Sequence, residues 1–300
     1  MPEPRTSYRR NRQCFDLARD LGRQEAAALE RSLGIVFRTL PVITSELARN
    51  LGIMVCKRES VPGGALLEKS VGPGNGTFTI WIERRVPYQW GKYAIAHEIG
   101  HFLLLKNHAD LASRWELKLR ESFADAVACE ILVPRAARMR LAEVFRQIKR
   151  PEALVELASR FGVYPGVLLS AASSEPCWMR GLNTIWVRVS FRPNWFTGLG
   201  PRLRINAAHY DSERFFVPVN LSLRHFCGSD DWLLGLNPGE VRSRDSVSIS
   251  LCLKQLSANN TFTYPRVRVT GNLAAMRFAD SPHPNASPII LMAQLEMNQE

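Results

Sequence analysis

The sequence lacks any apolar run long enough to cross a lipid bilayer. Its longest apolar stretches, residues 102–105 and 288–295, fall far short of the ~20 residues that a membrane-spanning helix needs. Arginines lie close to the N-terminus, but no apolar segment follows them as it would in a secretory signal. The sequence therefore predicts a cytoplasmic protein with no membrane span.

Paired cysteines are also missing. The six cysteines stand far apart, and none forms the Cys-x-x-Cys pair that is typical of zinc knuckles and dithiol redox sites. Reduced thiols are therefore expected. Collagen-like and low-complexity segments are absent as well, while 46% of the 300 residues are hydrophobic and 22% are charged. These proportions predict a folded globular chain with room for two or three domains.

Acidic residues are fewer than basic ones, and the imbalance is uneven along the chain. The formal net charge is +11, of which residues 1–150 carry +9 and residues 151–300 carry +2. This asymmetry is compatible with an anionic partner, such as nucleic acid or a protein that binds nucleic acid. A surplus of arginine also keeps a small domain in solution, so the charge alone does not establish such a partner.

Periodicity separates a helical first part from a β-rich second part. Apolar residues recur at helical spacing over residues 8–33, 88–106, 115–133 and 151–172. Strands are expected at residues 53–55 and 77–82, and the second would form a hairpin with residues 63–67 across a glycine-rich turn. Beyond residue 176 the apolar period becomes two.

We therefore expect an α+β chain of three parts. Residues 1–136 would form a mainly helical domain with a small sheet, residues 137–176 a helical segment resembling a helix-turn-helix, and residues 177–300 a β-rich accessory domain.

The strongest chemical signal is the segment His97-Glu98-Ile99-Gly100-His101. Two histidines four residues apart on a helix point the same way and can share one metal ion, and the glutamate between them can take a proton from an attacking water molecule. The alternative is a helix with two packed histidines. Glu121 favours the metal site, because a carboxylate from a second helix is the usual third ligand, and Asp125 lies one turn further on the same face.

The chain resembles the ImmA/IrrE family of zinc metallopeptidases over roughly residues 20–170. The segment KYAIAHEIGHFLL at residues 92–104 is similar to the family's active-site helix, and ESFADAVACEILVP at residues 121–134 is similar to its second signature. Tyr93 and Ala94 stand where Phe and Thr are commoner, and Val127 and Val133 also depart from the pattern. None of these departures falls on an expected ligand.

The resemblance implies a zinc-dependent endopeptidase. His97, His101 and Glu121 would be the metal ligands, Glu98 the general base, and Asp125 the residue that orients a ligand histidine. Zinc is the expected ion, although such a ligand set also accepts manganese or another divalent metal. The group that stabilises the oxyanion is not evident; the candidates, each more often structural, are Tyr88, Tyr93, His108 and Tyr164.

The strand at residues 77–82 is a candidate substrate-binding element. If it lies at the edge of its sheet, Thr79, Ile80 and Trp81 could pair with an extended peptide. An ordinary core strand is the equal alternative.

Family members act on repressor proteins, which implies a DNA-binding repressor as the protein substrate here and induction of a stress-response or mobile-element regulon. Direct DNA binding is not expected, because the second helix of the segment at residues 154–170 offers almost no side chains that could bind a base edge. Some family members carry a sensor-like domain in a long C-terminal extension, and the resemblance makes residues 177–300 a candidate for such a domain, with a small molecule or other signal as its candidate ligand. A non-catalytic DNA-binding regulator with a structural metal site and a broad-specificity peptidase are the competing hypotheses.

Overall fold

The computed structural model divides into two units, which are described separately below. The first unit comprises residues 1–137 and 159–167, and the second comprises residues 138–158 and 168–300. Within these units the structure describes residues 4–33, 41–70, 77–135, 137–138, 144, 147–148, 150–174, 184–192, 202–210, 215–217, 226–227, 233, 236–237, 240–253, 255–256, 262–277 and 289–295.

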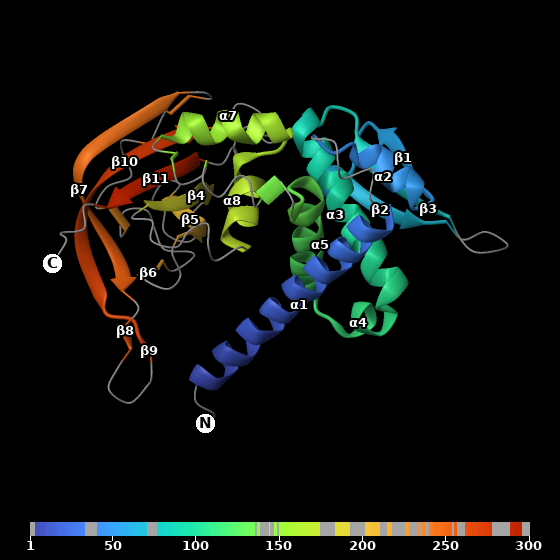
Figure 1. The fold of residues 1–300 in the computed structure, drawn as a ribbon, viewed down its shortest axis with the longest axis horizontal. Coiled ribbons are helices and arrows are strands. Elements are labelled where there is room, and N and C mark those ends of the chain that lie inside the picture. The colour runs from blue at the N-terminus through green and yellow to red at the C-terminus, as the bar shows by residue number, and fades with distance from the viewer. Residues whose placement is uncertain are drawn as a thin grey trace. The chain divides into compact units, whose positions relative to one another are not determined.

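Five α-helices, one 3₁₀ turn and three strands make up the first unit up to residue 132 (Figure 1). In chain order they are α1 (Pro4–Leu33), α2 (Thr44–Asn50), β1 (Ile53–Arg58), η1 (Pro62–Gly64), β2 (Ala65–Lys69), β3 (Phe78–Glu83), α3 (Tyr88–Asn107), α4 (Ala109–Arg114) and α5 (Leu117–Leu132). The helices expected at residues 8–33, 88–106 and 115–133 and the two expected hairpin strands are present.

Helix α1 packs on α5 through a face that contains two alanines, a glycine and a leucine. Ala18, Ala26 and Leu29 are buried, and a methyl group added to Gly22 would lie 2.6 Å from the carbonyl oxygen of Phe123. This spacing of three and four residues places them on one face. Leu17, an apolar residue that directly precedes Ala18, lies off this face and is 62% exposed.

The three-stranded sheet has the order β1-β3-β2, which corrects one expectation. Strand β3 pairs in parallel with β1 and antiparallel with β2, so Thr79, Ile80 and Trp81 lie in the central strand. Both sides of β3 are already hydrogen-bonded, and no peptide can be added there. The two edges of the sheet belong to β1 and β2.

Helix α3 is apolar around most of its circumference because it is covered on two sides. It contacts β2 and β3 as well as α5, and its buried residues include Ala96, Ile99 and Leu103. Gly100 makes the contact with α5 close, since an added Cβ would lie 2.7 Å from the Cα atom of Ala124.

Two further helices contain the points along the chain at which the assignment to the two units changes. Helix α7 (Pro151–Phe161) begins at a proline and ends before Gly162, which has φ +61°, and α8 (Pro165–Ser174) begins at the next proline. Residues 159–167 group with the first unit, whereas residues 150–158 and 168–174 group with the second.

The second unit contains a six-stranded antiparallel sheet of order β5-β4-β11-β10-β7-β6. Its strands are β4 (Thr184–Arg192), β5 (Arg202–His209), β6 (Phe215–Phe216), β7 (Val241–Leu253), β10 (Arg266–Arg277) and β11 (Ile289–Leu295); β8 (Gln255–Leu256) and β9 (Phe262–Thr263) pair separately.

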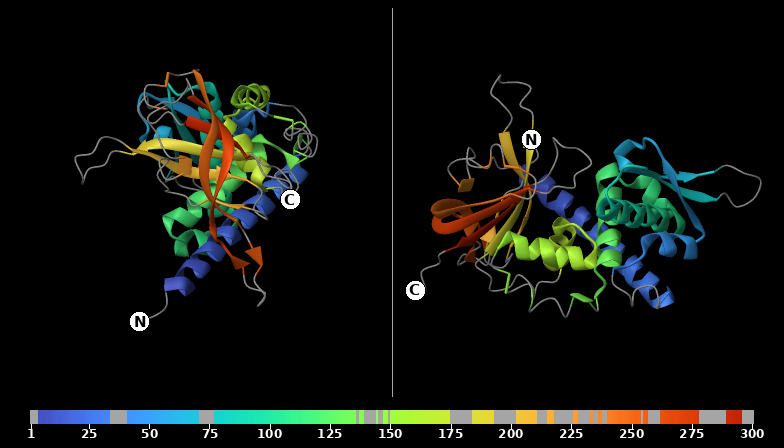
Figure 2. Two further views of the ribbon diagram at one scale, coloured as in Figure 1. Left: turned by 90° about the vertical axis from the view of Figure 1, so that its left-hand side faces the viewer. Right: turned by 90° about the horizontal axis from the view of Figure 1, so that it is seen from above.

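The long strands β7 and β10 bend along their length (Figures 1 and 2). Their register shifts between Gly271 and Leu273, and opposite this point Ser246 has φ +53° and donates its backbone N–H to Asn272 Oδ1 at 3.0 Å. An irregularity of this kind increases local twist.

Alternating residues from the six-stranded sheet form an apolar core. Ile185, Val187, Ile249, Leu273 and Leu291 are each at most 1% exposed. The fold class expected from the sequence, a helical domain followed by a sheet-rich region, is therefore confirmed. Among the described residues, no helix has the length and apolar character needed to span a membrane.

Candidate metal centre

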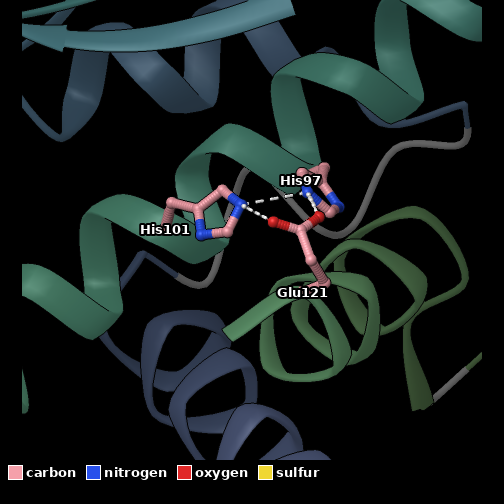
Figure 3. Close-up of side chains that lie close together, drawn as sticks. All are labelled: His97, His101 and Glu121. Carbon is pink, nitrogen blue, oxygen red and sulfur yellow. Dashed lines mark hydrogen bonds and ion pairs between the residues drawn. The ribbon is translucent and has the colours of Figure 1, made fainter. Parts of the chain in front are cut away.

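Three side chains from two helices converge in the first unit (Figure 3). His97 and His101 lie one turn apart on α3, with their Nε2 atoms 3.1 Å apart. Glu121, at the start of α5, places Oε2 3.2 Å from His97 Nε2 and Oε1 3.4 Å from His101 Nε2. One ligand atom from each residue lies within 4.8 Å of the others, and we call these three residues the candidate metal centre.

The close approach of α3 and α5 brings Glu121 within reach of the histidines. Gly100 lies between the two histidines in the sequence, and its missing side chain is what allows the Cα atom of Ala124 to come near. Because Glu121 precedes Ala124 by one turn of α5, the carboxylate is carried to the histidine face of α3.

Asp125 determines which nitrogen of His97 faces the centre. Asp125 Oδ1 lies 3.0 Å from His97 Nδ1, which assigns the ring proton to Nδ1 and leaves a lone pair on Nε2. Two imidazole nitrogens and a carboxylate are the donor set that zinc prefers at sites with three protein ligands. The residues therefore fit a divalent transition metal such as zinc.

The two histidines have opposite pKa shifts. Burial alone would lower the pKa of His97, but the hydrogen bond and charge of Asp125, with the charges of Glu98 and Glu121, raise it above its ordinary value. Burial, and secondarily the electrostatic effects of the neighbouring His97 and Arg120, lower the pKa of His101 to about 4. His101 is therefore neutral at pH 7 and keeps a lone pair for a metal.

Glu98 lies beside the centre, in a drier environment. Its side chain is 8% exposed, and its Oε2 accepts the backbone N–H of Leu67, on edge strand β2, at 2.9 Å. Burial is the main reason that the pKa of Glu98 is raised, while the Leu67 N–H and the charge of His97 oppose the shift. A carboxylate with a raised pKa is suited to accept a proton and return it.

The centre is open to solvent on the side of Glu121, whose side chain is 43% exposed. Metal sites with a purely structural role usually have four protein ligands, whereas catalytic sites have three and an open position. Within the described part of the chain, three candidate ligands come together.

The structure also shows partners that the sequence analysis missed. No residue pattern in the sequence indicates that the backbone N–H of Leu67 donates to Glu98. Tyr93, a candidate for stabilising the oxyanion, instead donates a hydrogen bond from its hydroxyl to Asp125. His108 binds Glu25 at 2.8 Å, and Tyr88 is 70% exposed, so neither belongs to the candidate metal centre.

Comparisons with known proteins concern the family and the fold of the chain. Residues 48–173 match the sequence model of a peptidase family, described as the IrrE N-terminal-like domain, and this range includes both α3 and α5. No curated protein matches the sequence. Among solved structures, a Mycobacterium tuberculosis transcriptional regulator is similar, with 16% sequence identity, a TM-score of 0.52 and coverage of 93% of each chain. At that identity the likeness shows the fold alone.

Proposed function

We propose that the protein is a zinc-dependent endopeptidase, because residues 48–173 match the IrrE N-terminal-like domain of a peptidase family and because of the geometry described above. The observation that carries the proposal is the convergence of His97, His101 and Glu121 beside the buried carboxylate of Glu98. The open side of the candidate metal centre favours catalysis over the alternative of a structural metal site.

In this proposal His97, His101 and Glu121 hold the metal, and Asp125 keeps the proton on His97 Nδ1 so that Nε2 remains a donor. A bound zinc ion supplies Lewis acidity, which polarises a carbonyl group and makes water easier to deprotonate. Glu98 takes the proton from the attacking water onto its carboxylate. Its raised pKa then allows it to deliver that proton to the leaving amine.

We propose a DNA-binding repressor as the protein substrate. This follows the role that the family resemblance implies. Direct DNA binding is disfavoured by α8, because Val167, Leu168 and Leu169, which stand where a recognition helix would present side chains, are buried. A cytoplasmic site of action is consistent with such a substrate.

The β-rich part, residues 177–300, is proposed to regulate or recruit rather than to catalyse, with a small signal molecule as its candidate ligand. The candidate ligands and the base all lie before residue 126, and among the described residues of the second unit no group of His, Cys, Asp and Glu converges as the candidate metal centre does.

The decisive experiment incubates the zinc-loaded full-length protein with helix-turn-helix repressors encoded near its gene. Cleavage into defined fragments is expected, and a chelator should stop it. Glu98→Gln should keep zinc but lower the cleavage rate by about 10²- to 10⁴-fold, because the amide cannot accept the proton.

Two outcomes would contradict the proposal. Equal cleavage by wild type and Glu98→Gln would remove Glu98 as the base. Stoichiometric zinc binding without cleavage of any repressor or of unfolded casein would favour a structural site in a non-catalytic regulator. Cleavage of casein alone would indicate a broad-specificity peptidase.

A further inference from the structure

Tyr93 and His97 bind the same oxygen of Asp125. The Tyr93 hydroxyl donates to Asp125 Oδ1, and His97 Nδ1 lies 3.0 Å from that oxygen. Tyr93 precedes His97 by four residues on α3, while Asp125 comes from α5. A hydroxyl, a carboxylate and a ligand imidazole thus form one continuous chain across the two helices.

The Tyr93 ring is fixed independently of its hydroxyl. Its centroid lies 5.7 Å from that of Trp90 and 6.0 Å from that of His97, so neighbours one turn away on each side hold it. The hydroxyl is therefore presented to Asp125 by a ring that the packing of α3 already orients.

The Tyr93 hydroxyl adds a restraint on Asp125 that burial does not provide. The Asp125 side chain is 55% exposed, so water competes for its oxygens and its rotamer has room to change. A second donor on Oδ1 restrains the carboxylate where His97 Nδ1 can use it. Outer partners of this kind orient ligand histidines and raise their basicity.

The hydroxyl also lies on the wrong side of the imidazole to act on a substrate. The hydroxyl contacts Asp125 Oδ1, the oxygen that accepts the Nδ1 proton of His97. His101 and Glu121 face Nε2, on the opposite side of the ring. Tyr93 is therefore separated from the reacting groups by His97 itself.

We propose that Tyr93 is a positioning residue of the candidate metal centre, which acts on His97 through Asp125. This inference rests on the proposed function, because it assumes that His97 binds a metal. Phenylalanine, which is commoner at this position in the family pattern, would fill the same space without the second donor. The Tyr93 hydroxyl therefore adds a polar support that the ring alone does not provide.

The test measures metal binding rather than cleavage. Zinc affinity is obtained by competition with a chromogenic chelator, and cobalt substitution gives the visible absorption spectrum of the site. Tyr93→Phe should weaken zinc binding by about 3- to 10-fold and change the cobalt spectrum, a smaller effect than the 10- to 100-fold typical when an orienting carboxylate is lost. Tyr88→Phe removes a hydroxyl from the exposed start of the same helix and should match wild type within about twofold.

A double-mutant cycle identifies the route. Asp125→Asn alone should weaken binding by about 10- to 100-fold, and adding Tyr93→Phe to it should change nothing further, since the hydroxyl acts only through the carboxylate. Thermal unfolding of the metal-free proteins should give Tyr93→Phe the same midpoint as Tyr88→Phe.

Three results would overturn the inference. The first is a zinc affinity of Tyr93→Phe equal to that of Tyr88→Phe. The second is an effect of Tyr93→Phe on zinc affinity that has the same size in wild type and in Asp125→Asn. The third is a metal-free Tyr93→Phe protein that is unfolded, which would make the hydroxyl a requirement of folding. A wild-type protein that binds no zinc would instead overturn the proposed function, so the two failures are distinguishable.

Discussion

The first unit buries ionisable side chains on the helix that carries both candidate ligand histidines, whereas the buried cluster of the six-stranded sheet in the second unit is apolar among its described residues. Lys92 and Glu98, both on α3, are 4% and 8% exposed. The buried cluster around Ile185, Ile249 and Leu291 contains only apolar side chains and Cys227. Burying a charge is costly unless it is compensated, so side chains such as Lys92 and Glu98 suggest a purpose other than stability.

The reactive side chains of this protein lie in the first unit, on a helix that is also part of its core. An apolar sheet core stabilises its unit and leaves reactive groups to other parts of the molecule. In the first unit the same helix that packs against the sheet also carries both histidines and the candidate base, so stability and reactivity depend on the same residues of α3.

The comparison would break most clearly if a metal bound outside the first unit. His101→Ala removes one of the three candidate ligands and should weaken zinc binding by more than about 100-fold, beyond the loss expected for an outer partner. His108→Ala, on the residue that follows the same helix, removes a histidine bonded to Glu25 and should leave zinc affinity unchanged. Chelator competition and metal analysis of the purified proteins measure both. Full zinc content in the His101 variant would show that the metal lies elsewhere.

A matched pair of glycines sharpens the comparison at the level of packing. A Cβ added at Gly100 would lie 2.7 Å from the Cα atom of Ala124, and one added at Gly271 would lie 2.6 Å from the carbonyl oxygen of Gln294. Each alanine should lower the free energy of unfolding by about 1 to 3 kcal/mol, because backbone atoms must move. Only Gly100→Ala should also weaken zinc binding, since it forces α5 and Glu121 away from the histidines.

Denaturant unfolding and chelator competition separate these effects. If Gly271→Ala weakened zinc binding as much as Gly100→Ala, the candidate metal centre would depend on the second unit, and the separation of roles would fail.

The sequence predicts the candidate metal centre better than it predicts the sheet beside it. The four-residue spacing of His97 and His101 requires only a helix, and Glu121 required only the expectation of a second helix nearby. Both conditions are local properties that periodicity reveals. The structure accordingly brings these three side chains together.

The position of β3 could not be predicted in the same way. Alternation shows that a strand has a buried face, but an edge strand and a central strand can alternate alike. The order β1-β3-β2 is decided by the parallel pairing of β1, which comes from a segment about twenty residues earlier. The Leu67 N–H that Glu98 accepts depends on the same arrangement, and so no residue pattern could indicate it.

The smallest expected effect concerns the buried charge of Lys92. Its Nζ lies 3.4 Å from the carbonyl oxygen of Phe161, at the end of α7, and 5.6 Å from the ring centroid of Tyr88. Burial lowers the pKa of Lys92 from 10.5 to about 8. Between pH 8 and 10.5 the unfolded chain therefore binds more protons than the folded one, and the contribution of Lys92 to the free energy of unfolding rises with pH through that window.

Below pH 8 the cost of the buried charge is fully present, so removing the charge should help most there. Lys92→Met keeps most of the apolar stem and should raise the free energy of unfolding at pH 7 by about 1 to 2 kcal/mol while abolishing the rise above pH 8. Lys106→Met on the exposed end of α3, where the ammonium lies 5.4 Å from the Phe102 ring centroid, is the matched control and should retain the wild-type pH dependence. Urea unfolding at a series of pH values measures both variants. If the free energy of unfolding of Lys92→Met still rose above pH 8, the rise would come from another group. The buried charge of Lys92 would then lack the expected cost.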